Sequence, residues 1–123
     1  MPLKIILHIT TQKDWEKAQK DDEYTAPSLQ TEGFIHCSTV KQTVDTANIF
    51  FKGQQGLVLL CIDENKLTAE CKYEDPTGGA QHDPNVGSLS PHIYGPVNLS
   101  AIIKTVDFPV NEDGTFSLPK EIN

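Results

Sequence analysis

The sequence lacks arginine altogether, and all ten of its basic residues are lysines. Arginine grips phosphate through a planar pair of N–H groups, whereas lysine offers only a point charge. Any phosphate on a ligand must therefore be held by lysine, backbone amides, hydroxyls or histidine. The formal net charge is -7, which argues against general nucleic-acid binding because such binding depends on neutralising phosphates with basic side chains.

Cysteine and long apolar runs are also scarce. The chain has three cysteines and no C-x-x-C pair, so the sequence indicates neither a disulfide framework nor a thiolate zinc site. No apolar run approaches the roughly 20 residues of a membrane helix, and the apolar run that follows Lys4 is too short for a signal-peptide core. We therefore expect no membrane association and a cytoplasmic location, while the oligomeric state stays open.

The length of 123 residues predicts one domain over residues 1–123. Alternating residues over 4–10 predict a strand whose mixed face carries His8 and Thr10. The uninterrupted apolar run over 57–62 predicts a central strand buried on both faces, where Cys61 packs rather than reacts. Further strands are expected over 69–74 and 101–108, with a hairpin turn at 113–114 and a connection over 24–32.

Two helices are predicted from their first turns. Thr11 and Asp14 have the spacing of a helix N-cap and begin a short peripheral helix. A second helix should begin near Thr39 and end near Gly53, because apolar residues recur at helical spacing between them. Residues 75–90 show neither period and are rich in glycine and proline, which is typical of a functional loop and predicts a lid.

Residues 33–39 form the junction between a strand and the second helix. In an extended backbone Ile35 and Cys37 point to the core, and His36 and Ser38 point to the opposite side. The hydroxyls of Ser38 and Thr39 would then lie at a helix N-terminus, where unpaired amides favour an anionic ligand.

Three of the four histidines occur in one local pattern: histidine, apolar residue, hydroxyl residue. The three copies are His8-Ile9-Thr10, His36-Cys37-Ser38 and His92-Ile93-Tyr94. On a strand, each copy places an imidazole and a hydroxyl on one face and the middle residue on the other. We expect the three histidines to line one cleft, although each taken singly could be an ordinary half-buried residue.

Other chemistries use the same residues. Three histidines could form a catalytic zinc site, but no spacing motif supports one. Cys37 is a poor nucleophile because its neighbour His36 points to the opposite face of the strand. Among the carboxylates, Glu74 is the first candidate because it ends a strand where the long loop begins, and Glu32 is the second. Sequence alone does not separate Asp75 from Glu74.

The motifs resemble those of the small proteins grouped as domain-of-unknown-function family 952. The most specific are E-G-F-I-H-C-S-T at residues 32–39 and P-H-I-Y-G-P at residues 91–96. The resemblance also uses residues 8–11, Trp15, residues 28–29, 46–48 and 50–51, Gly53, residues 62–63 and Glu74, and it covers residues 7–101. The family commonly has phenylalanine before the P-H motif, where this chain has Ser90.

The resemblance implies a compact relative of the ADP-ribosyltransferase fold: a single α+β domain with two small sheets and a central cleft. It implies that NAD is a substrate, that His8 contacts a ribose hydroxyl and that the Tyr94 ring stacks on nicotinamide. It further implies that Glu74 steadies an oxocarbenium-like transition state. The related RNA 2'-phosphotransferases depend on arginine, so that activity is not expected here.

These observations lead to one hypothesis and two rivals. The first is an enzyme that transfers or hydrolyses ADP-ribose from NAD at a histidine-lined cleft, without a metal. Its candidate catalytic residues are His8, His36, Glu74 and His92, and its candidate substrate contacts are Thr10, Ser38, Thr39 and Tyr94. The rivals are a non-catalytic module that binds a nucleotide or small anion in the same cleft, and a zinc hydrolase.

Overall fold

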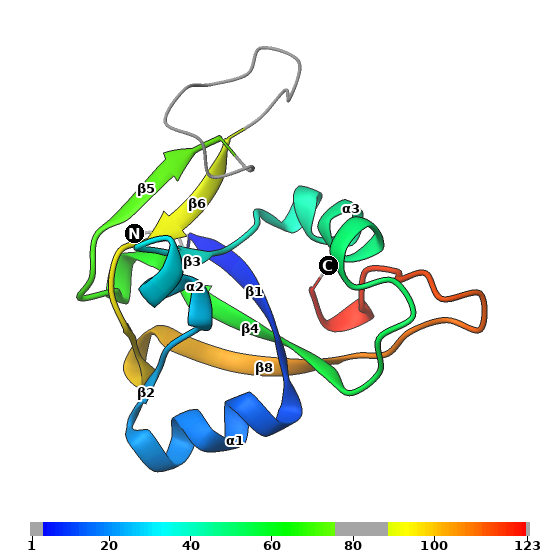
Figure 1. Ribbon diagram of the computed structural model, residues 1–123, viewed down its shortest axis with the longest axis horizontal. Helices are drawn as coiled ribbons and strands as arrows, with labels where there is room; N and C mark the ends of the chain where they lie inside the picture. Colours follow the sequence, from blue (N-terminus) through cyan, green and yellow to red (C-terminus); the bar gives the residue numbers. More distant parts are fainter. Residues whose placement is uncertain (1–3, 76–88, 123) are drawn as a thin grey trace.

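The computed structural model describes residues 4–75 and 89–122 of the chain. Its largest element is a three-stranded antiparallel sheet made of β1 (Ile5–Thr11), β4 (Leu57–Asp63) and β8 (Ile102–Phe108), in the order β1-β4-β8. All seven residues of β4 are buried, as expected for the central strand of a sheet covered on both faces. Figure 1 shows this sheet crossing the molecule.

Two smaller antiparallel sheets flank the first. One pairs β2 (Glu23–Tyr24) with β7 (Val97–Asn98), and the other has the order β3-β6-β5. In the latter, β3 (Ile35–His36) and β5 (Cys71–Glu74) lie on either side of β6 (Ser90–Ile93). The register places His36 and Lys72 on either side of His92, so these three side chains share one face.

Three α-helices and three short 3-10 helices complete the described part of the chain. The α-helices are α1 (Gln12–Asp21), α2 (Pro27–Thr31) and α3 (Val40–Phe50); the 3-10 helices are Glu64–Lys66, Leu99–Ala101 and Lys120–Ile122. Thr11 caps α1 by accepting a hydrogen bond from the Asp14 N–H at 3.0 Å. Gly33, at φ +91°, makes the turn from α2 into β3, a conformation that glycine adopts without strain.

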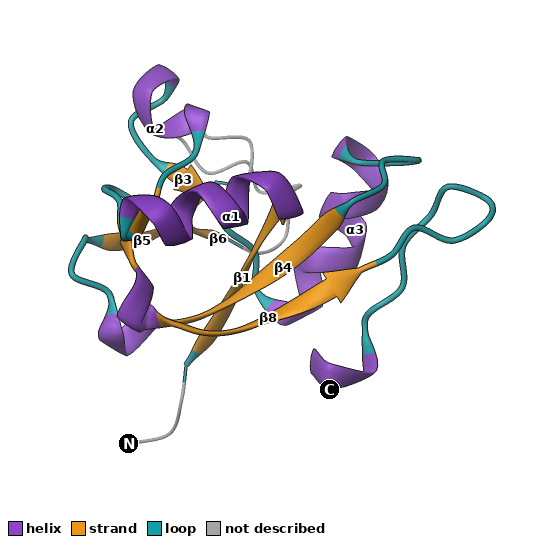
Figure 2. Ribbon diagram, turned by 90° about the horizontal axis from the view of Figure 1, so that it is seen from below, coloured by secondary structure: helices purple, strands orange, loops and turns teal. Residues whose placement is uncertain are grey.

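The large sheet separates two apolar cores. One face, including Ile6 and Leu60, packs with Ala18 of α1 and with Ile35 and Ile93 of the β3-β6-β5 sheet. The other packs with Ala47 of α3 and with Phe116 of the C-terminal segment. Figure 2 shows α1 and α3 on opposite sides of the sheet. Alternate residues of β1 therefore serve different cores.

The outer edge of β1 is paired at one point. Leu7 exchanges two backbone hydrogen bonds of 2.8 Å with Ser38, and this bridge is isolated from the named strands. The chain enters Ser38 from β3 and leaves it toward α3. The bridge therefore brings two elements, β3 and α3, to the edge of β1, and the edge beyond Leu7 faces the space between them.

Most of the predicted elements are confirmed. The strands expected over 4–10 and 57–62 are β1 and β4, and the helices that begin beside Thr11 and Thr39 are α1 and α3. The interpretation of residues 24–32 as a connection was wrong, because they contain α2 and the end of β2. The expectation of two sheets was also wrong, since three are present. No ladder follows the turn at 113–114 in the described structure.

The expected lid over 75–90 lies almost entirely outside the described residues. Within residues 4–75 and 89–122, none of the helices combines the length and apolar character that crossing a bilayer requires.

Candidate functional site

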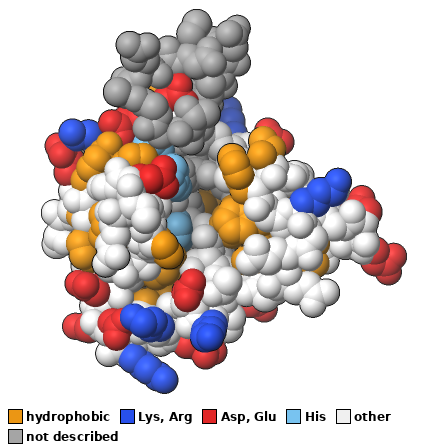
Figure 3. All heavy atoms as spheres, viewed as in Figure 1, with side chains coloured by type: hydrophobic (Ala, Val, Ile, Leu, Met, Phe, Trp, Pro, Cys, Tyr) orange, Lys and Arg blue, Asp and Glu red, His pale blue; other side chains and the backbone are white. Residues whose placement is uncertain are grey.

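A cleft of about 600 Å³ opens along the free edge of β1, between the β3-β6-β5 sheet and α3. Figure 3 shows histidine side chains within a hollow that has apolar side chains on both sides. The lining comprises Leu7, His8, Ile9, Ser28, Glu32, His36, Cys37, Ser38, Thr46, Phe50, Phe51, Ser90 and His92. The three histidines of the repeated pattern thus share one cleft.

At the β1 end, both ring nitrogens of His8 are occupied. Nδ1 lies 2.6 Å from the His36 carbonyl oxygen, and Nε2 lies 2.6 Å from the Tyr24 hydroxyl. A carbonyl can only accept, so Nδ1 carries the proton and Nε2 of the neutral ring accepts from Tyr24. The Tyr24 hydroxyl is also hydrogen-bonded to the Thr10 hydroxyl at 3.0 Å. Burial lowers the pKa of His8 to about 4, which keeps the ring neutral at pH 7.

At the β6 end, His92 has one occupied nitrogen. Nδ1 donates to Glu74 Oε1 at 3.0 Å, while Nε2 is buried and has no hydrogen-bond partner within the described part of the chain. Burial lowers the pKa of His92, although the hydrogen bond that its Nδ1 donates to Glu74 acts in the opposite direction. His92 is therefore neutral at pH 7, and its Nε2 carries an unused lone pair. A buried acceptor without a partner costs free energy and commonly marks a functional site.

Glu74 is held in place from a second direction. The Tyr94 hydroxyl donates to the same Oε1 that accepts from His92. These two bonds favour the ionised carboxylate, and the bond from Tyr94 is the larger cause of the lowered pKa of Glu74. Glu74 and Tyr94 stand behind His92 and are not among the residues that line the cleft.

His36 and Phe34 complete the wall around His92. His36 Nε2 lies 3.0 Å from Glu32 Oε2, and both side chains are partly exposed. The Phe34 ring is stacked on His92, with centroids 4.2 Å apart and planes at 14°. The His36 ring meets His92 edge-on at 5.2 Å. Ring contacts therefore fix the plane of the imidazole, and the hydrogen bond to Glu74 fixes the orientation of the ring within that plane.

Thr46 and Phe50 of α3 line the opposite side of the cleft, whereas its first turn is not among the lining residues and bonds to β6 instead. Thr39 and Gln42 make a reciprocal capping box, and the Thr39 N–H donates to Gln42 Oε1 at 3.1 Å. Gln42 also accepts from the Ser90 hydroxyl at 3.1 Å and donates to the Leu89 carbonyl at 2.9 Å. An anionic ligand at this helix N-terminus, as predicted, would therefore compete with bonds that are already made.

Some residues that were predicted from the sequence to contact a ligand lie elsewhere in the structure. His8, His36, Ser38 and His92 line the cleft. Thr10 lies behind His8 and binds Tyr24, Thr39 caps α3, and Glu74 and Tyr94 lie behind His92. Whether any of these residues acts on a ligand stays a prediction.

The structure also reveals contacts to cleft residues that were not predicted from the sequence. Tyr24 is hydrogen-bonded to His8, and Phe34 stacks on His92. Gln42 accepts a hydrogen bond from Ser90, which lies in the same strand as His92. Phe34 lies in the motif at residues 32–39 and could have been found there. Tyr24 could not, because its partners His8 and Thr10 are set by the pairing of β2 with β7 and not by a local pattern.

Two other chemistries lack support in the geometry. Among the described residues, no three His, Cys, Asp or Glu side chains are grouped so that they could hold a metal ion. Burial raises the pKa of the Cys37 thiol well above its usual value, so this cysteine is not a ready nucleophile.

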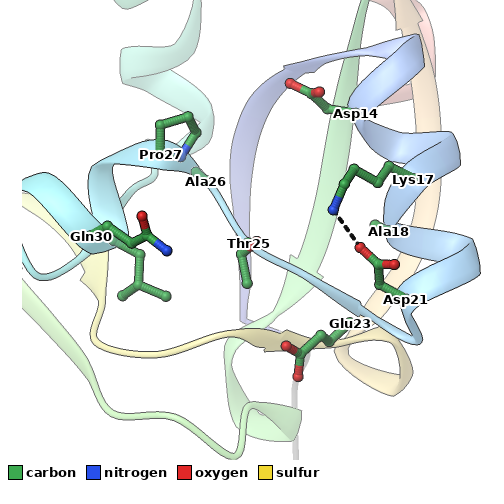
Figure 4. Close-up of a pocket in the computed structure, with 10 residues that line it drawn as sticks. Asp14, Lys17, Ala18, Asp21, Glu23, Thr25, Ala26, Pro27 and Gln30 are labelled. Carbon is green, nitrogen blue, oxygen red and sulfur yellow. Dashed lines mark hydrogen bonds and ion pairs between the residues drawn. The ribbon is translucent and has the colours of Figure 1, made fainter.

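A second, smaller hollow of about 370 Å³ lies between α1 and α2. Figure 4 shows that its side chains are mainly polar and that Lys17 reaches Asp21. Lys17 Nζ lies 2.7 Å from Asp21 Oδ2. Asp14, Glu23 and Gln30 also line it. It contains none of the predicted site residues, and we therefore assign the site to the histidine cleft.

Comparisons with known proteins agree with the fold described here. A family model described as "Protein of unknown function (DUF952)" matches residues 9–105. The crystal structure of protein CC0527 from Caulobacter crescentus has a TM-score of 0.79 and 28% identity, covering 94% of this chain and 95% of that one. Its solution structure gives a TM-score of 0.73 at 28% identity, with 90% of each chain covered. The search among curated proteins found no match.

Proposed function

This chain belongs to the DUF952 family of proteins of unknown function, and we propose that it is an enzyme that uses NAD as a substrate. In this proposal ADP-ribose passes from NAD to an acceptor, or to water, in the histidine cleft. The reaction class is the one that the family resemblance implies through a compact relative of the ADP-ribosyltransferase fold, and three features of the cleft support it.

The observation that carries the proposal is the unequal use of the two nitrogens of His92. Glu74 accepts from Nδ1, Tyr94 holds Glu74, and Nε2 is left as a buried acceptor in the wall of a large cleft. A carboxylate that orients an imidazole while the far nitrogen stays available is the arrangement of a general base. Packing alone does not account for a buried Nε2 that has no partner among the described residues.

The free edge of β1 offers a second feature. Because Leu7 directs both its N–H and its C=O to Ser38, Ile9, two residues further on, directs its own pair to the same edge. Ile9 lines the cleft, and none of the described residues bonds to this pair. A ligand carboxamide could complete the ladder by accepting from the N–H and donating to the C=O, and the nicotinamide group of NAD is a carboxamide.

The size and chemistry of the cleft are the third feature. A volume of about 600 Å³ falls within the range of roughly 300–1,000 Å³ of small-molecule sites. Phe50 and Phe51 supply apolar surface for a ring, and Ser38 and Thr46 supply hydroxyls. The described lining residues include no lysine that could neutralise a phosphate. We therefore place the pyrophosphate of NAD toward the cleft mouth, away from Glu32.

A non-catalytic binding module is the second candidate. Phe50 is 74% exposed and Ile49 is 70% exposed at the end of α3, beside the cleft. Apolar side chains left in solvent favour binding of a partner or a large ligand without chemistry. Neither candidate needs a metal, and the geometry supplies no group of described residues for a zinc hydrolase.

Calorimetry with NAD, paired with an assay of nicotinamide release, tests the proposal. We expect wild-type protein and a Glu70→Gln control to bind NAD and release nicotinamide. Glu70 is an exposed residue outside the cleft, in an ion pair with Lys72. We expect His92→Asn to bind NAD but release nicotinamide far more slowly. Binding without release by wild type would favour the binding module, and absence of NAD binding would contradict the proposed enzyme.

A further inference from the structure

We infer that the acceptor in this reaction is a hydroxyl group, of water or of an alcohol, and that His92 Nε2 takes its proton. The inference deepens the proposed function and rests on it. It specifies the class of acceptor. Three features of the cleft support this class: the tautomer of His92, the charges around His92 and the polar lining. The fourth consideration is the protonation state of the acceptor itself.

The tautomer follows from Glu74. A carboxylate whose Oε1 accepts from both His92 and Tyr94 holds the proton of His92 on Nδ1. The two nitrogens of an imidazole diverge, so Nε2 is turned away from Glu74 and β5. The stacked Phe34 ring covers one face of the imidazole and prevents it from tilting. Nε2 can therefore only accept a hydrogen bond, and the missing partner must be a donor.

The charges near His92 leave it unprotonated when the ligand arrives. His36 from β3 opposes its protonation, while Glu74 from β5 and Glu32 from the end of α2 favour it. Lys72 acts on Glu74 from the same strand, and Tyr94 holds Glu74 by a neutral hydroxyl. Burial outweighs the two carboxylates, and the pKa of His92 stays below its usual 6.5.

A weak base of this kind discriminates between acceptor classes. Lysine and arginine side chains are protonated at neutral pH, with pKa values of about 10 and above 12, and an imidazole this weakly basic does not remove those protons. A hydroxyl is neutral and keeps a lone pair for attack. It becomes strongly acidic as its oxygen bonds to the sugar, so a neutral imidazole can take the proton in the transition state.

The lining of the cleft is consistent with such an acceptor. Apart from the histidines and Cys37, the uncharged polar side chains among the described lining residues are hydroxyls: Ser28, Ser38, Thr46 and Ser90. Among the described lining residues Glu32 is the one carboxylate, and it is already paired with His36 Nε2. A cationic acceptor would need a free carboxylate in the cleft, and none of the described lining residues supplies one.

The chemistry of the step is balanced without a further reagent. The glycosidic C–N bond of NAD breaks, and its electron pair goes to the departing nicotinamide, which becomes neutral. The acceptor oxygen forms a bond to the anomeric carbon, and its proton passes to His92 Nε2 and then to solvent. The products are nicotinamide, a proton, and ADP-ribose when the acceptor is water or an O-linked ADP-ribosyl compound when it is an alcohol.

The test is to incubate the protein with NAD alone, with added methanol and with added agmatine, and to identify the products by mass spectrometry. We expect ADP-ribose in all three mixtures, O-methyl ADP-ribose with methanol, and no agmatine adduct. We expect product formation to fall about 10²–10⁴-fold in His92→Asn, because Asn keeps a donor for Glu74 and removes the base. The wild-type rate should rise with pH through a midpoint below 6.5.

The outcomes separate this inference from the proposed function. Nicotinamide release with an agmatine adduct would leave the proposed function standing and overturn the hydroxyl acceptor. O-linked products formed by His92→Asn at the wild-type rate and pH profile would overturn the role of His92. If His92→Asn fails to fold, the midpoint of the wild-type pH profile decides, since a midpoint at or above 6.5 contradicts the role. No nicotinamide release at all would overturn both proposals.

Discussion

The β1 end and the β6 end of the cleft each present a histidine, and the two differ in what their ring nitrogens bind. Both ring nitrogens of His8 are hydrogen-bonded within the protein, one to a carbonyl oxygen and one to the Tyr24 hydroxyl. His92 donates a hydrogen bond from Nδ1 to Glu74, and its Nε2 has no partner among the described residues. The same three-residue pattern thus gives one histidine with both nitrogens bonded and one whose Nε2 has no partner among the described residues. We propose that the first serves stability and the second serves chemistry. Each prediction below tests that division.

The largest expected effect is on the pH dependence of stability. His8 has a pKa of about 4 in the folded protein and about 6.5 when unfolded, so the unfolded chain binds the extra proton first as pH falls. The free energy of unfolding should therefore fall by about 3 kcal/mol between pH 7 and pH 4 from His8 alone. Urea denaturation across this range measures it.

The control for this pH effect is His8→Gln, which removes the titrating group. Its stability at pH 7 should be lower, but its profile should be flatter than that of the wild type between pH 7 and pH 4. His92 contributes in the same direction in both proteins, because burial lowers its pKa as well. Parallel profiles for the two proteins would show that His8 does not hold the β1 end as described.

The next effect is on the reaction rate and concerns Glu74 at the β6 end. Glu74→Gln keeps an oxygen that can accept from His92 and Tyr94 but removes the charge that stabilises the imidazolium. Nicotinamide release should fall roughly 10²-fold, equivalent to about 2.7 kcal/mol. The midpoint of its pH profile should move to lower pH, a change that a purely structural role would not cause.

Glu70→Gln is the matched control, since it makes the same substitution on an exposed side chain that is not among the lining residues of the cleft. We expect its rate and its pH midpoint to equal those of the wild type. Equal rates in Glu74→Gln and wild type would remove Glu74 as the residue that positions His92.

The smallest effect compares the two tyrosine hydroxyls. Tyr24→Phe removes the buried partner of His8 Nε2, and it should lower the free energy of unfolding by about 1–3 kcal/mol. Tyr94→Phe removes a hydroxyl at a half-exposed position and should cost less than about 1 kcal/mol while reducing the rate of nicotinamide release. Thermal or urea denaturation of both variants measures the difference. A larger stability loss in Tyr94→Phe would reverse the comparison.

The parts of the fold that the sequence predicted are those with a sustained period. Residues 4–10, residues 57–62 and the helix after Thr39 each carry enough residues for an alternating, uninterrupted or helical pattern to be visible. The two-residue strands β2 and β7 are too short to show a period, so no pattern indicated the sheet they form, and the expectation of two sheets came from the family resemblance alone. Their pairing is decided by partners distant in the sequence.

The candidate site could be predicted in part for the same reason. Local pattern identified His8, His36 and His92 as residues of a common wall, and the structure does bring them to one cleft. It could not assign their hydrogen bonds, because the partners Tyr24 and Glu74 come from other elements. Sequence alone therefore treated the histidines as equivalent, and only the geometry separates the one that is satisfied from the one that is not.

The cross-strand pair of His36 and His92 has a consequence for how the protein folds. The site joins a strand from the first third of the chain to one from the last third, so loop closure between them must precede any assembly of the base. Antiparallel pairings over such separations form slowly compared with helices, on a millisecond to second scale for small β-rich domains. A chain still emerging from the ribosome carries His8 and His36 long before it carries His92. Catalytic competence should therefore appear only after synthesis of β6, and a chain truncated before it should have no activity.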